Sequence, residues 1–335
     1  MIPCRNHSKL ATTAACLVLA CSMANGVHAA GFQALKVPAA KGGAEIHAIA
    51  WTPCAQAPAA VPLGPYVIRG VRNCAIAGRS LPLVVISHGQ GGSYLGHHDT
   101  ASAMADAGLV VVSFNHPGDS VGDDSTAQRL GIFESRPRDV SRVISFMLSD
   151  WPYRLQLDPG AIGVFGFSRG GYTALALAGA TPSVATSAQR FCNPWWSFVI
   201  SLCRQLDADN ARITPQADSR VRAVVVVDPL DLFAADGIGK VRIPVQLWAS
   251  ELGGDGVALD HVEAIRVALR QPPEYRVARG AGHFAYLAPC PPQFKQSEPR
   301  LCKDPDGFNR ERWHQAMNVS IITFFKQQLR NHSVR

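Results

Sequence analysis

A serine between two glycines is the strongest chemical signal in this chain of 335 residues. Ser168 stands in Gly166-Phe-Ser-Arg-Gly170, which fits the G-x-S-x-G pattern of a serine nucleophile. The apolar run 162–165 before it predicts a buried strand, and the small residues 173–178 after it predict a helix. On such a turn the glycines permit close backbone approach, and the hydroxyl stands at a helix N-terminus that favours negative charge. The pattern therefore predicts that Ser168 is a nucleophile.

A histidine late in the chain is the expected base. His283 lies in Gly280-Ala-Gly-His-Phe284, directly after the expected strand 274–277. This placement fits the order serine, acid, histidine that accompanies a strand–serine–helix turn. We therefore predict that His283 takes the proton of Ser168. Four other histidines lie on loops near the same sheet edge and are interpreted as pocket-lining or structural: His88, His97, His98 and His116.

The carboxylate that orients the histidine has three candidates. It must be buried enough to hold an imidazole N–H and to stabilise the imidazolium. Asp255 is preferred, because it lies in the turn that follows the run 245–250, just before the expected helix 259–269. Asp228, which follows the Val-rich run 223–227, is the alternative acid, and Glu251 is the third candidate.

A second glycine-rich loop, Ser87-His-Gly-Gln-Gly-Gly92, follows the first expected parallel strand. Backbone N–H groups in such a loop can point together at an oxyanion, and we predict the amides of Gln90 and Arg169 as the two donors. A phosphate-binding loop would end in G-K-[ST], which is missing here, so a nucleotide is not expected. No cofactor is expected, and no metal either, because no C-x-x-C or clustered cysteine–histidine spacing occurs.

The order of elements predicts an α/β fold. From Leu83 onwards, short β-branched runs alternate with helical patterns, which indicates a mostly parallel, doubly wound sheet covered on both faces. Residues 31–51 are expected to add antiparallel edge strands, and residues 30–335 to form one domain. The expected strands are 83–87, 109–114, 162–165, 223–227, 245–248 and 274–277, and the expected helices are 97–107, 138–149, 173–178, 259–269 and 309–329.

The regular alternation is interrupted at about 181–220. An insertion of this length inside an α/β fold often becomes a lid. Its aromatic residues Trp195, Trp196 and Phe198 have two interpretations that the sequence leaves open. They form an apolar wall over a substrate pocket, or they pack the insertion onto the body of the domain.

The first 29 residues are interpreted as a signal peptide. A positively charged start precedes the apolar core 10–20, and Val27-His-Ala29 fits a small-residue cleavage site. The alternative is a lipid anchor at Cys21. The interpretation predicts an exported protein, either periplasmic or secreted.

Cysteine spacing supports export. Six cysteines remain after the leader, and local pairing would close three irregular or Pro-rich stretches. Disulfides of this kind persist in oxidising compartments. The predicted pairs are Cys54–Cys74, Cys192–Cys203 and Cys290–Cys302.

Composition excludes several other classes of protein. The formal net charge of +7 is spread along the chain without a basic block, so binding to nucleic acid is not expected. Beyond the leader, no apolar run approaches the roughly 18 residues that a transmembrane helix needs. The oligomeric state is not constrained by the sequence.

Taken together, the motifs resemble a known group. The chain is similar to bacterial predicted dienelactone hydrolases within the α/β-hydrolase superfamily, which are akin to platelet-activating-factor acetylhydrolases. This resemblance implies ester hydrolysis through an acyl-enzyme, without a cofactor, on a small-molecule or lipid-like ester. The matching pieces, in chain order, are 87–92, 115–118, Arg136-Pro137 with Asp139, 157–159, 162–171 and 282–290.

Two departures limit what the resemblance implies. Dienelactone hydrolases proper use a cysteine where Ser168 stands, so lactone opening does not follow from the name. In the acetylhydrolase branch the acid follows the sixth strand, which would select Asp228, whereas other branches would select Asp255. Two rival functions are a serine peptidase, although no large module restricts access to peptides, and a catalytically silent binding module, although all residue types of a triad are present.

Overall fold

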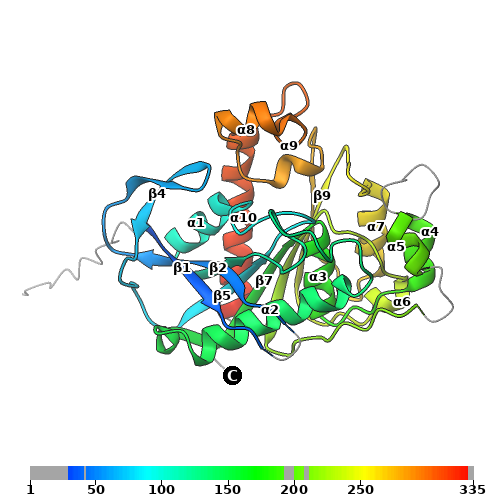
Figure 1. Ribbon diagram of the computed structural model, residues 1–335, viewed down its shortest axis with the longest axis horizontal. Helices are drawn as coiled ribbons and strands as arrows, with labels where there is room; N and C mark the ends of the chain where they lie inside the picture. Colours follow the sequence, from blue (N-terminus) through cyan, green and yellow to red (C-terminus); the bar gives the residue numbers. More distant parts are fainter. Residues whose placement is uncertain (1–28, 41–42, 192–199, 207–210, 331–335) are drawn as a thin grey trace, which may run out of the picture.

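The structure, a computed structural model, describes residues 29–40, 43–191, 200–206 and 211–330. Its strands are β1 (Ala29–Val37), β2 (Ile46–Cys54), β3 (Ala59–Leu63), β4 (Tyr66–Arg72), β5 (Leu81–Ser87), β6 (Val110–Phe114), β7 (Leu157–Phe167), β8 (Val221–Val227), β9 (Val245–Ser250) and β10 (Glu274–Ala278). They form one sheet in the order β10-β9-β8-β7-β5-β6-β2-β1-β4-β3 (Figure 1). From β10 to β6 every pair is parallel, whereas β2 joins β6 and β1 antiparallel. The predicted α/β class with a mostly parallel sheet is confirmed.

Helices cover both faces of this sheet. They are α1 (His98–Asp106), α2 (Ile132–Ser149), α3 (Arg169–Leu177), α4 (Val184–Phe191), α5 (Ile200–Leu206), α6 (Ala235–Ile238), α7 (Leu259–Ala268), α8 (Pro292–Ser297), α9 (Pro299–Cys302) and α10 (Arg310–Arg330). Leu83 and Val85 of β5 belong to the core with α2 and α3, whereas Val84 and Ile86 belong to the core with α1 and α10. Because side chains alternate across a strand, burial on both faces explains the continuous apolar runs. Within the described part of the chain, no helix is both long and apolar enough to cross a membrane.

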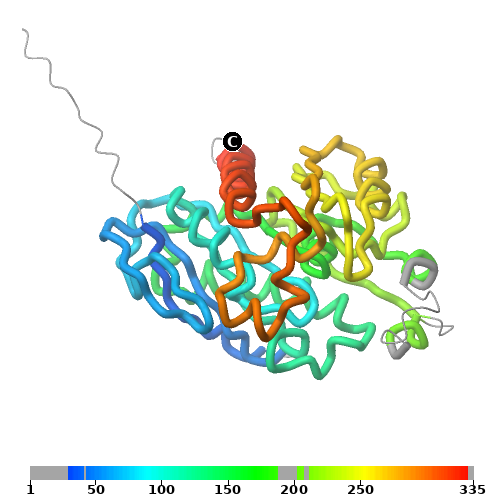
Figure 2. Tube along the Cα trace, turned by 90° about the horizontal axis from the view of Figure 1, so that it is seen from above, coloured from blue at the N-terminus to red at the C-terminus, as the bar shows by residue number. Residues whose placement is uncertain are grey.

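The sheet extends across the whole molecule. Figure 2 shows the N-terminal strands at one end and the segments around residues 240–280 at the other, with α10 between them. Gly163 of β7 makes room for α10, because a Cβ atom there would lie 2.6 Å from the Phe325 ring. A side chain at this position would therefore push the helix away from the sheet.

Helix α2 begins at Ile132, earlier than the predicted start at 138, and contains Pro137. A proline inside a helix leaves the carbonyl four residues before it without its usual N–H donor. Here that carbonyl belongs to Phe133, and it accepts a hydrogen bond of 3.0 Å from the Tyr172 hydroxyl of α3. This replacement bond explains why the helix continues through the proline.

The N-terminal part forms the predicted antiparallel strands, β1 and β2, but they do not lie at the edge of the sheet, because an additional hairpin, β3–β4, lies beyond them. The hairpin was not expected, because its strands are short and largely exposed and β3 contains Pro62. β1 begins at Ala29, the last residue of the predicted signal peptide. Residues 1–28 lie outside the described part, so the signal peptide and the alternative lipid anchor at Cys21 stay predictions.

The insertion at 181–220 is described only in part. Its helix α5 is attached to the segment before α2, because Gln205 accepts a hydrogen bond from the Leu130 N–H and donates one to the Gln128 carbonyl, both at 2.9 Å. The role of the insertion as a lid remains a prediction. The aromatic residues expected to line a pocket lie outside the described residues: Trp195, Trp196 and Phe198.

Two of the three predicted disulfides are confirmed, Cys54–Cys74 and Cys290–Cys302. The third pair, Cys192–Cys203, stays a prediction because Cys192 lies outside the described residues. The Cys54–Cys74 bond spans the β3–β4 hairpin, whose pairing with β1 involves two residue pairs, Gly31 with Val71 and Phe32 with Arg72. The disulfide therefore attaches the hairpin covalently to the end of β2, where few residues of the hairpin pair with β1.

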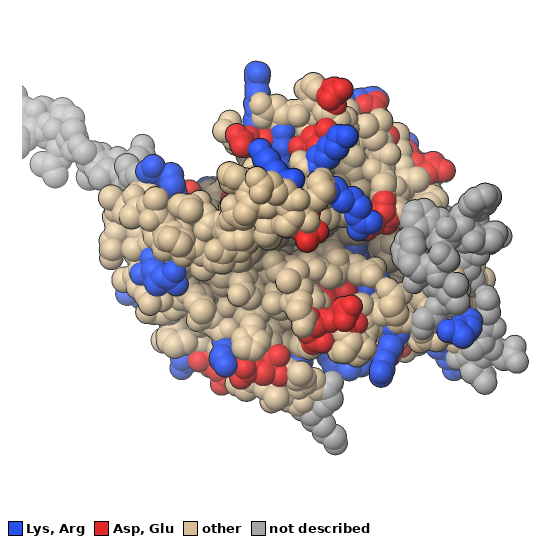
Figure 3. Space-filling view, turned by 45° about the horizontal axis from the view of Figure 1, so that its top comes forward, with Lys and Arg blue, Asp and Glu red and all other residues tan. Residues whose placement is uncertain are grey.

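Charged side chains are scattered over the surface. Basic and acidic groups are interspersed on the face seen in Figure 3, and no broad area of one sign covers it. Several basic side chains are paired with carboxylates, including Lys36 with Glu45 at 3.0 Å and Arg279 with Glu251 at 2.6 Å.

Replacing Cys54 and Cys74 together by serine is expected to destabilise the hairpin selectively. Releasing a loop with a sequence separation of 20 should lower the free energy of unfolding by about 3 kcal/mol. Limited proteolysis should then cut first within residues 59–72, and chemical denaturation should show the loss of stability. The matched Cys290→Ser, Cys302→Ser variant should leave the hairpin protected. Equal protection of the hairpin in both variants would contradict this role.

Candidate active site

Ser168 lies on a sharp turn between β7, which ends at Phe167, and α3, which begins at Arg169. Its φ of 55° and ψ of −118° are strained for a residue with a side chain. The turn is held from the next strand, because the Ser168 N–H donates to the Val227 carbonyl of β8 at 2.9 Å. Ser168 is 7% exposed. We call residues 166–170 the serine turn.

The two glycines of the serine turn are required by close backbone contacts. A Cβ atom on Gly166 would overlap the carbonyl oxygen of Gly170, and a Cβ atom on Gly170 would overlap the carbonyl oxygen of Ser87. Backbone atoms cannot move aside as a flexible side chain can. The G-x-S-x-G pattern therefore reflects the packing of α3 against the ends of β7 and β5.

His283 comes from the loop after β10 and lies next to the serine turn. Its ring stacks on Phe167, with the centroids 4.7 Å apart and the planes at 29°. The backbone N–H of His283 donates to the Gly253 carbonyl at 2.7 Å, which attaches the loop to the turn after β9. Nδ1 donates to a carboxylate oxygen of Asp228 at 2.8 Å. The buried Nε2 has no hydrogen-bond partner among the described residues.

Asp228 follows β8 and is completely buried. Besides His283, its carboxylate accepts hydrogen bonds from the Ser250 N–H at 2.7 Å and the Ser250 hydroxyl at 2.5 Å. These donors fix the carboxylate, whose Oδ2 accepts from both the Ser250 hydroxyl and the imidazole. Such an arrangement holds the Nδ1–H tautomer, so that Nε2 is the ring nitrogen able to accept a proton.

The preference for Asp255 as the acid is corrected by this geometry. Asp255 lies in the turn after β9, where its half-exposed carboxylate is 3.8 Å from the Arg300 guanidinium. Glu251, the third candidate, accepts hydrogen bonds from the Gly280 N–H at 2.7 Å and from Arg279 at 2.6 Å. β8 neighbours β7 directly, so the alternative acid, Asp228, is the carboxylate that contacts the histidine.

The two predicted oxyanion donors lie on neighbouring loops. Gln90 belongs to the loop after β5, which we call the glycine loop (residues 88–92), and Arg169 is the first residue of α3. The first N–H groups of a helix have no acceptor within it, which leaves the Arg169 amide free for another oxygen. The side chains also meet, because Arg169 donates from Nη2 to Oε1 of Gln90 at 2.5 Å. The loops approach closely, since a Cβ atom on Gly89 would lie 3.3 Å from Cβ of Ser168.

A buried ion cluster lies beneath these loops and was not predicted. Asp119 accepts from Arg136 at 2.7 Å and from Arg169 at 2.9 Å through the same oxygen. Burial alone would favour the neutral acid, but the two guanidinium groups outweigh it and hold the pKa of Asp119 below its usual value. Burial lowers the pKa of Arg136 to about 10, which leaves the guanidinium charged at neutral pH. The partners are 17 and 50 residues apart in sequence, so no local spacing indicated them.

The histidines interpreted as pocket-lining or structural are largely buried, and one of them belongs to a buried Ser–His–Asp chain. His116 contacts the Ser87 hydroxyl at 2.9 Å and the Asp139 carboxylate at 3.2 Å. Burial, followed by the charge of Arg136, lowers the pKa of His116 well below its usual value. All three members are buried, with Ser87 and His116 at 0% exposure. This chain supports the loops from inside and does not present a hydroxyl to a ligand.

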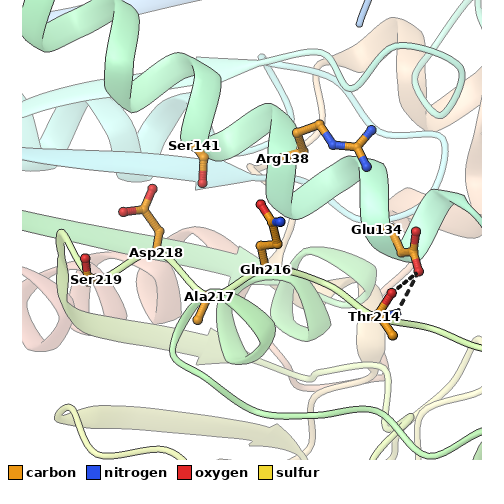
Figure 4. A pocket seen from close by; sticks show the side chains of 8 residues that line it. All are labelled: Glu134, Arg138, Ser141, Thr214, Gln216, Ala217, Asp218 and Ser219. Atoms are coloured by element: carbon orange, nitrogen blue, oxygen red, sulfur yellow. Dashed lines mark hydrogen bonds between the residues drawn. The ribbon is translucent and has the colours of Figure 1, made fainter. Parts of the chain in front are cut away.

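A cavity of about 480 Å³ lies between α2 and the segment 214–219 (Figure 4). The segment 214–219 on one side of it leads into the first residue of β8, at the amino ends of the parallel strands. Ser168 and Asp228 follow the carboxyl ends of their strands, so the cavity is separate from them. The lining residues are mostly polar: Glu134, Arg138, Ser141, Thr214, Gln216, Ala217, Asp218 and Ser219.

The parallel sheet, its two helical layers and the serine turn define the α/β-hydrolase fold. The structure is similar to that of a ferulic acid esterase from Streptomyces cinnamoneus, with a TM-score of 0.63, 19% identity and coverage of 90% of this chain and 91% of the other. It is also similar to a dienelactone hydrolase from Anabaena variabilis, with a TM-score of 0.45, 17% identity and coverage of 76% and 89%. No model of a protein family matches the sequence, and a search of curated proteins finds no match. At this level of identity the similarity to the esterase shows the fold.

Substituting Asp139 by asparagine should remove a pH-dependent loss of stability. Burial raises the pKa of Asp139 from 3.8 to about 6, so the folded protein keeps this proton over a range in which the unfolded chain releases it. The stability of the wild type should therefore fall relative to Asp139→Asn as the pH rises from about 4 to about 7, by up to about 3 kcal/mol. Denaturant unfolding of both proteins across this range measures the difference. A difference that stays constant with pH would contradict the expectation.

Proposed function

We propose that the protein hydrolyses carboxylic esters through an acyl-enzyme intermediate, with Ser168 as nucleophile, His283 as base and Asp228 as acid. The observation that carries the proposal is the 2.8 Å hydrogen bond between His283 and buried Asp228, beside a serine held at a φ of 55°. A carboxylate, an imidazole and a serine on a strand-to-helix turn are the parts that acyl transfer requires.

In the first half of the reaction, Oγ of Ser168 attacks the ester carbonyl while Nε2 of His283 takes its proton. The imidazolium that forms is stabilised by Asp228 through Nδ1–H. The developing oxyanion accepts hydrogen bonds from the amides of Gln90 and Arg169, each worth roughly 3–4 kcal/mol at the transition state. His283 then gives its proton to the leaving alcohol, and the acyl group remains on the serine.

In the second half, water replaces the alcohol. Nε2 of His283 takes a proton from the water, whose oxygen attacks the acyl carbon, and the same two amides hold the second oxyanion. Collapse releases the carboxylic acid and returns the proton to Ser168. Every proton moves among Ser168, His283, the substrate and water, so the proposed route needs no cofactor or metal.

The structural similarity to an esterase supports an ester as substrate. The resemblance to dienelactone hydrolases and platelet-activating-factor acetylhydrolases supports a small-molecule or lipid-like ester. We also propose export to the periplasm or the medium, because the two disulfides would persist in an oxidising compartment.

Replacing Ser168 by alanine should abolish ester hydrolysis, with a fall in kcat of several orders of magnitude. A fluorophosphonate probe should label the wild type, but not Ser168→Ala. Ser87→Ala is a matched control, because Ser87 also contacts a histidine that contacts an aspartate, and this variant should still be labelled. p-Nitrophenyl esters assay the reaction, and peptide anilides test for a peptidase. Undiminished esterase activity in Ser168→Ala would refute the mechanism.

The acid is tested by comparing Asp228→Asn with Asp255→Asn. Both residues have a positive φ, of 44° and 51°, which asparagine tolerates, so the substitutions are matched in backbone cost. Asp228→Asn should lower kcat by about 10³–10⁴-fold, because the amide no longer holds the correct tautomer or stabilises the imidazolium. Asp255→Asn should change kcat by less than about threefold, because its carboxylate does not contact His283. Steady-state kinetics with one ester decides, and the reverse ranking would restore Asp255.

A further inference from the structure

The side chain of Arg169 reaches across the candidate active site. The sequence singles out this residue for its backbone amide, but its guanidinium makes three hydrogen bonds of its own. Nη2 donates to Oε1 of Gln90 at 2.5 Å, and Nη1 donates to Asp119 and to the Ala127 carbonyl, both at 2.9 Å. Arg169 is 3% exposed, and its bonds to Asp119 and Ala127 are buried, whereas the bond to Gln90 is partly buried. The residue that follows the nucleophile is thus bonded to the residue that carries the other proposed oxyanion donor.

Asp119 provides a second connection between the same two loops. One carboxylate oxygen accepts from Arg169 of the serine turn, and the other accepts from the Gly91 N–H of the glycine loop at 3.0 Å. Arg136 holds the carboxylate from behind at 2.7 Å and also donates to the His88 carbonyl. Asp119 and Arg136 are both at 0% exposure. The carboxylate therefore connects the two loops on the buried side, while Gln90 and Arg169 connect them nearer the surface.

We infer that Arg169 is a positioning residue, whose side chain, together with Asp119, fixes its own amide relative to the amide of Gln90. This inference rests on the proposed function. The two amides follow different strands, β5 and β7, so their separation depends on contacts between the loops. Oxyanion donors act when they lie about 2.7–3.1 Å from the oxygen, and they act most strongly on the charged transition state. Loosening the connection should therefore lower kcat and leave KM almost unchanged.

Arg169 also contributes to packing, and the test must separate the two roles. Its guanidinium lies 5.4 Å from the centre of the Phe133 ring, and it shares Asp119 with buried Arg136. A purely structural role would lower thermal stability without a selective effect on the transition state. Gln90 helps to separate the roles, because its side chain is exposed and its replacement leaves the core intact.

The experiment compares Arg169→Met, Gln90→Met and the double variant with the wild type. Both substitutions keep the backbone amide and remove the side-chain bond between the loops. We expect Arg169→Met to lower kcat about 10- to 100-fold and Gln90→Met about 10-fold, with KM within about twofold. An aryl boronic acid, which forms a tetrahedral adduct with a catalytic serine, should inhibit the variants more weakly in proportion to kcat. The double variant should be no worse than Arg169→Met alone, because the two residues act through one bond.

Arg220→Met is the matched control. Arg220 forms an ion pair of 2.6 Å with Asp218 near the amino end of β8, away from the serine turn. This variant should keep the kcat, the KM and the boronic acid inhibition of the wild type, whatever happens to its melting temperature.

The outcomes distinguish the inference from the proposed function. If the wild type is active and both Arg169→Met and Gln90→Met keep its kcat, the positioning role is overturned while the esterase proposal stands. Fully multiplicative effects in the double variant would likewise overturn it. If Arg169→Met does not fold, Gln90→Met decides alone, a selective fall in kcat supporting the role and an unchanged kcat refuting it. A wild type without esterase activity would overturn both proposals.

Discussion

The packing of the first turn of α3 against the end of β5 is the constraint on which the rest of the site depends. Gly170 lies so close to the Ser87 carbonyl that no side chain fits between them. This contact holds Ser168 at a positive φ, which costs of order 1–3 kcal/mol and persists only where the surroundings enforce it. Hydrogen bonds join Ser168 to β8 and to the loop beyond it, from its N–H to Val227 and from Leu230 to its carbonyl. The serine is therefore held from both neighbouring strands.

The order of the strands explains how the other groups reach the serine. β7 lies between β5 and β8, so the glycine loop and Asp228 are its immediate neighbours at the carboxyl edge. His283 follows β10, three strands from β7, and its loop must return toward the serine. The ring of His283 stacks on Phe167, and its backbone N–H bonds to Gly253; these two contacts hold the loop beside the serine turn. The turn after β9 thus contacts the histidine through its backbone, which leaves Asp255 directed away, toward Arg300.

The features that the sequence predicts correctly are those that depend on residues close together in the chain. The parallel strands, the serine turn and the late histidine depend on short patterns, and they were predicted within a few residues. Asp228 could not be separated from Asp255, because the choice depends on which strand lies beside β7. Helix α2 starts earlier than expected because Tyr172 satisfies the carbonyl that Pro137 leaves free. The sequence does not predict the ion cluster around Asp119. Its partners, Arg136 and Arg169, are 17 and 50 residues away in the chain, and no periodic pattern connects them.

The buried chain of Ser87, His116 and Asp139 shows that residue types alone do not define a catalytic site. In the buried chain, Nε2 of His116 is occupied by Ser87, a strand residue at 0% exposure. At the candidate active site, Nε2 of His283 has no hydrogen-bond partner in the described part of the chain, and Ser168 stands on a strained turn. A nucleophile needs a base with an open nitrogen and a hydroxyl that a ligand can reach. In the buried chain, Ser87 occupies the nitrogen of His116 and has no exposed surface. The backbone at Ser168 is therefore what distinguishes the proposed catalytic chain from a structural one of the same composition.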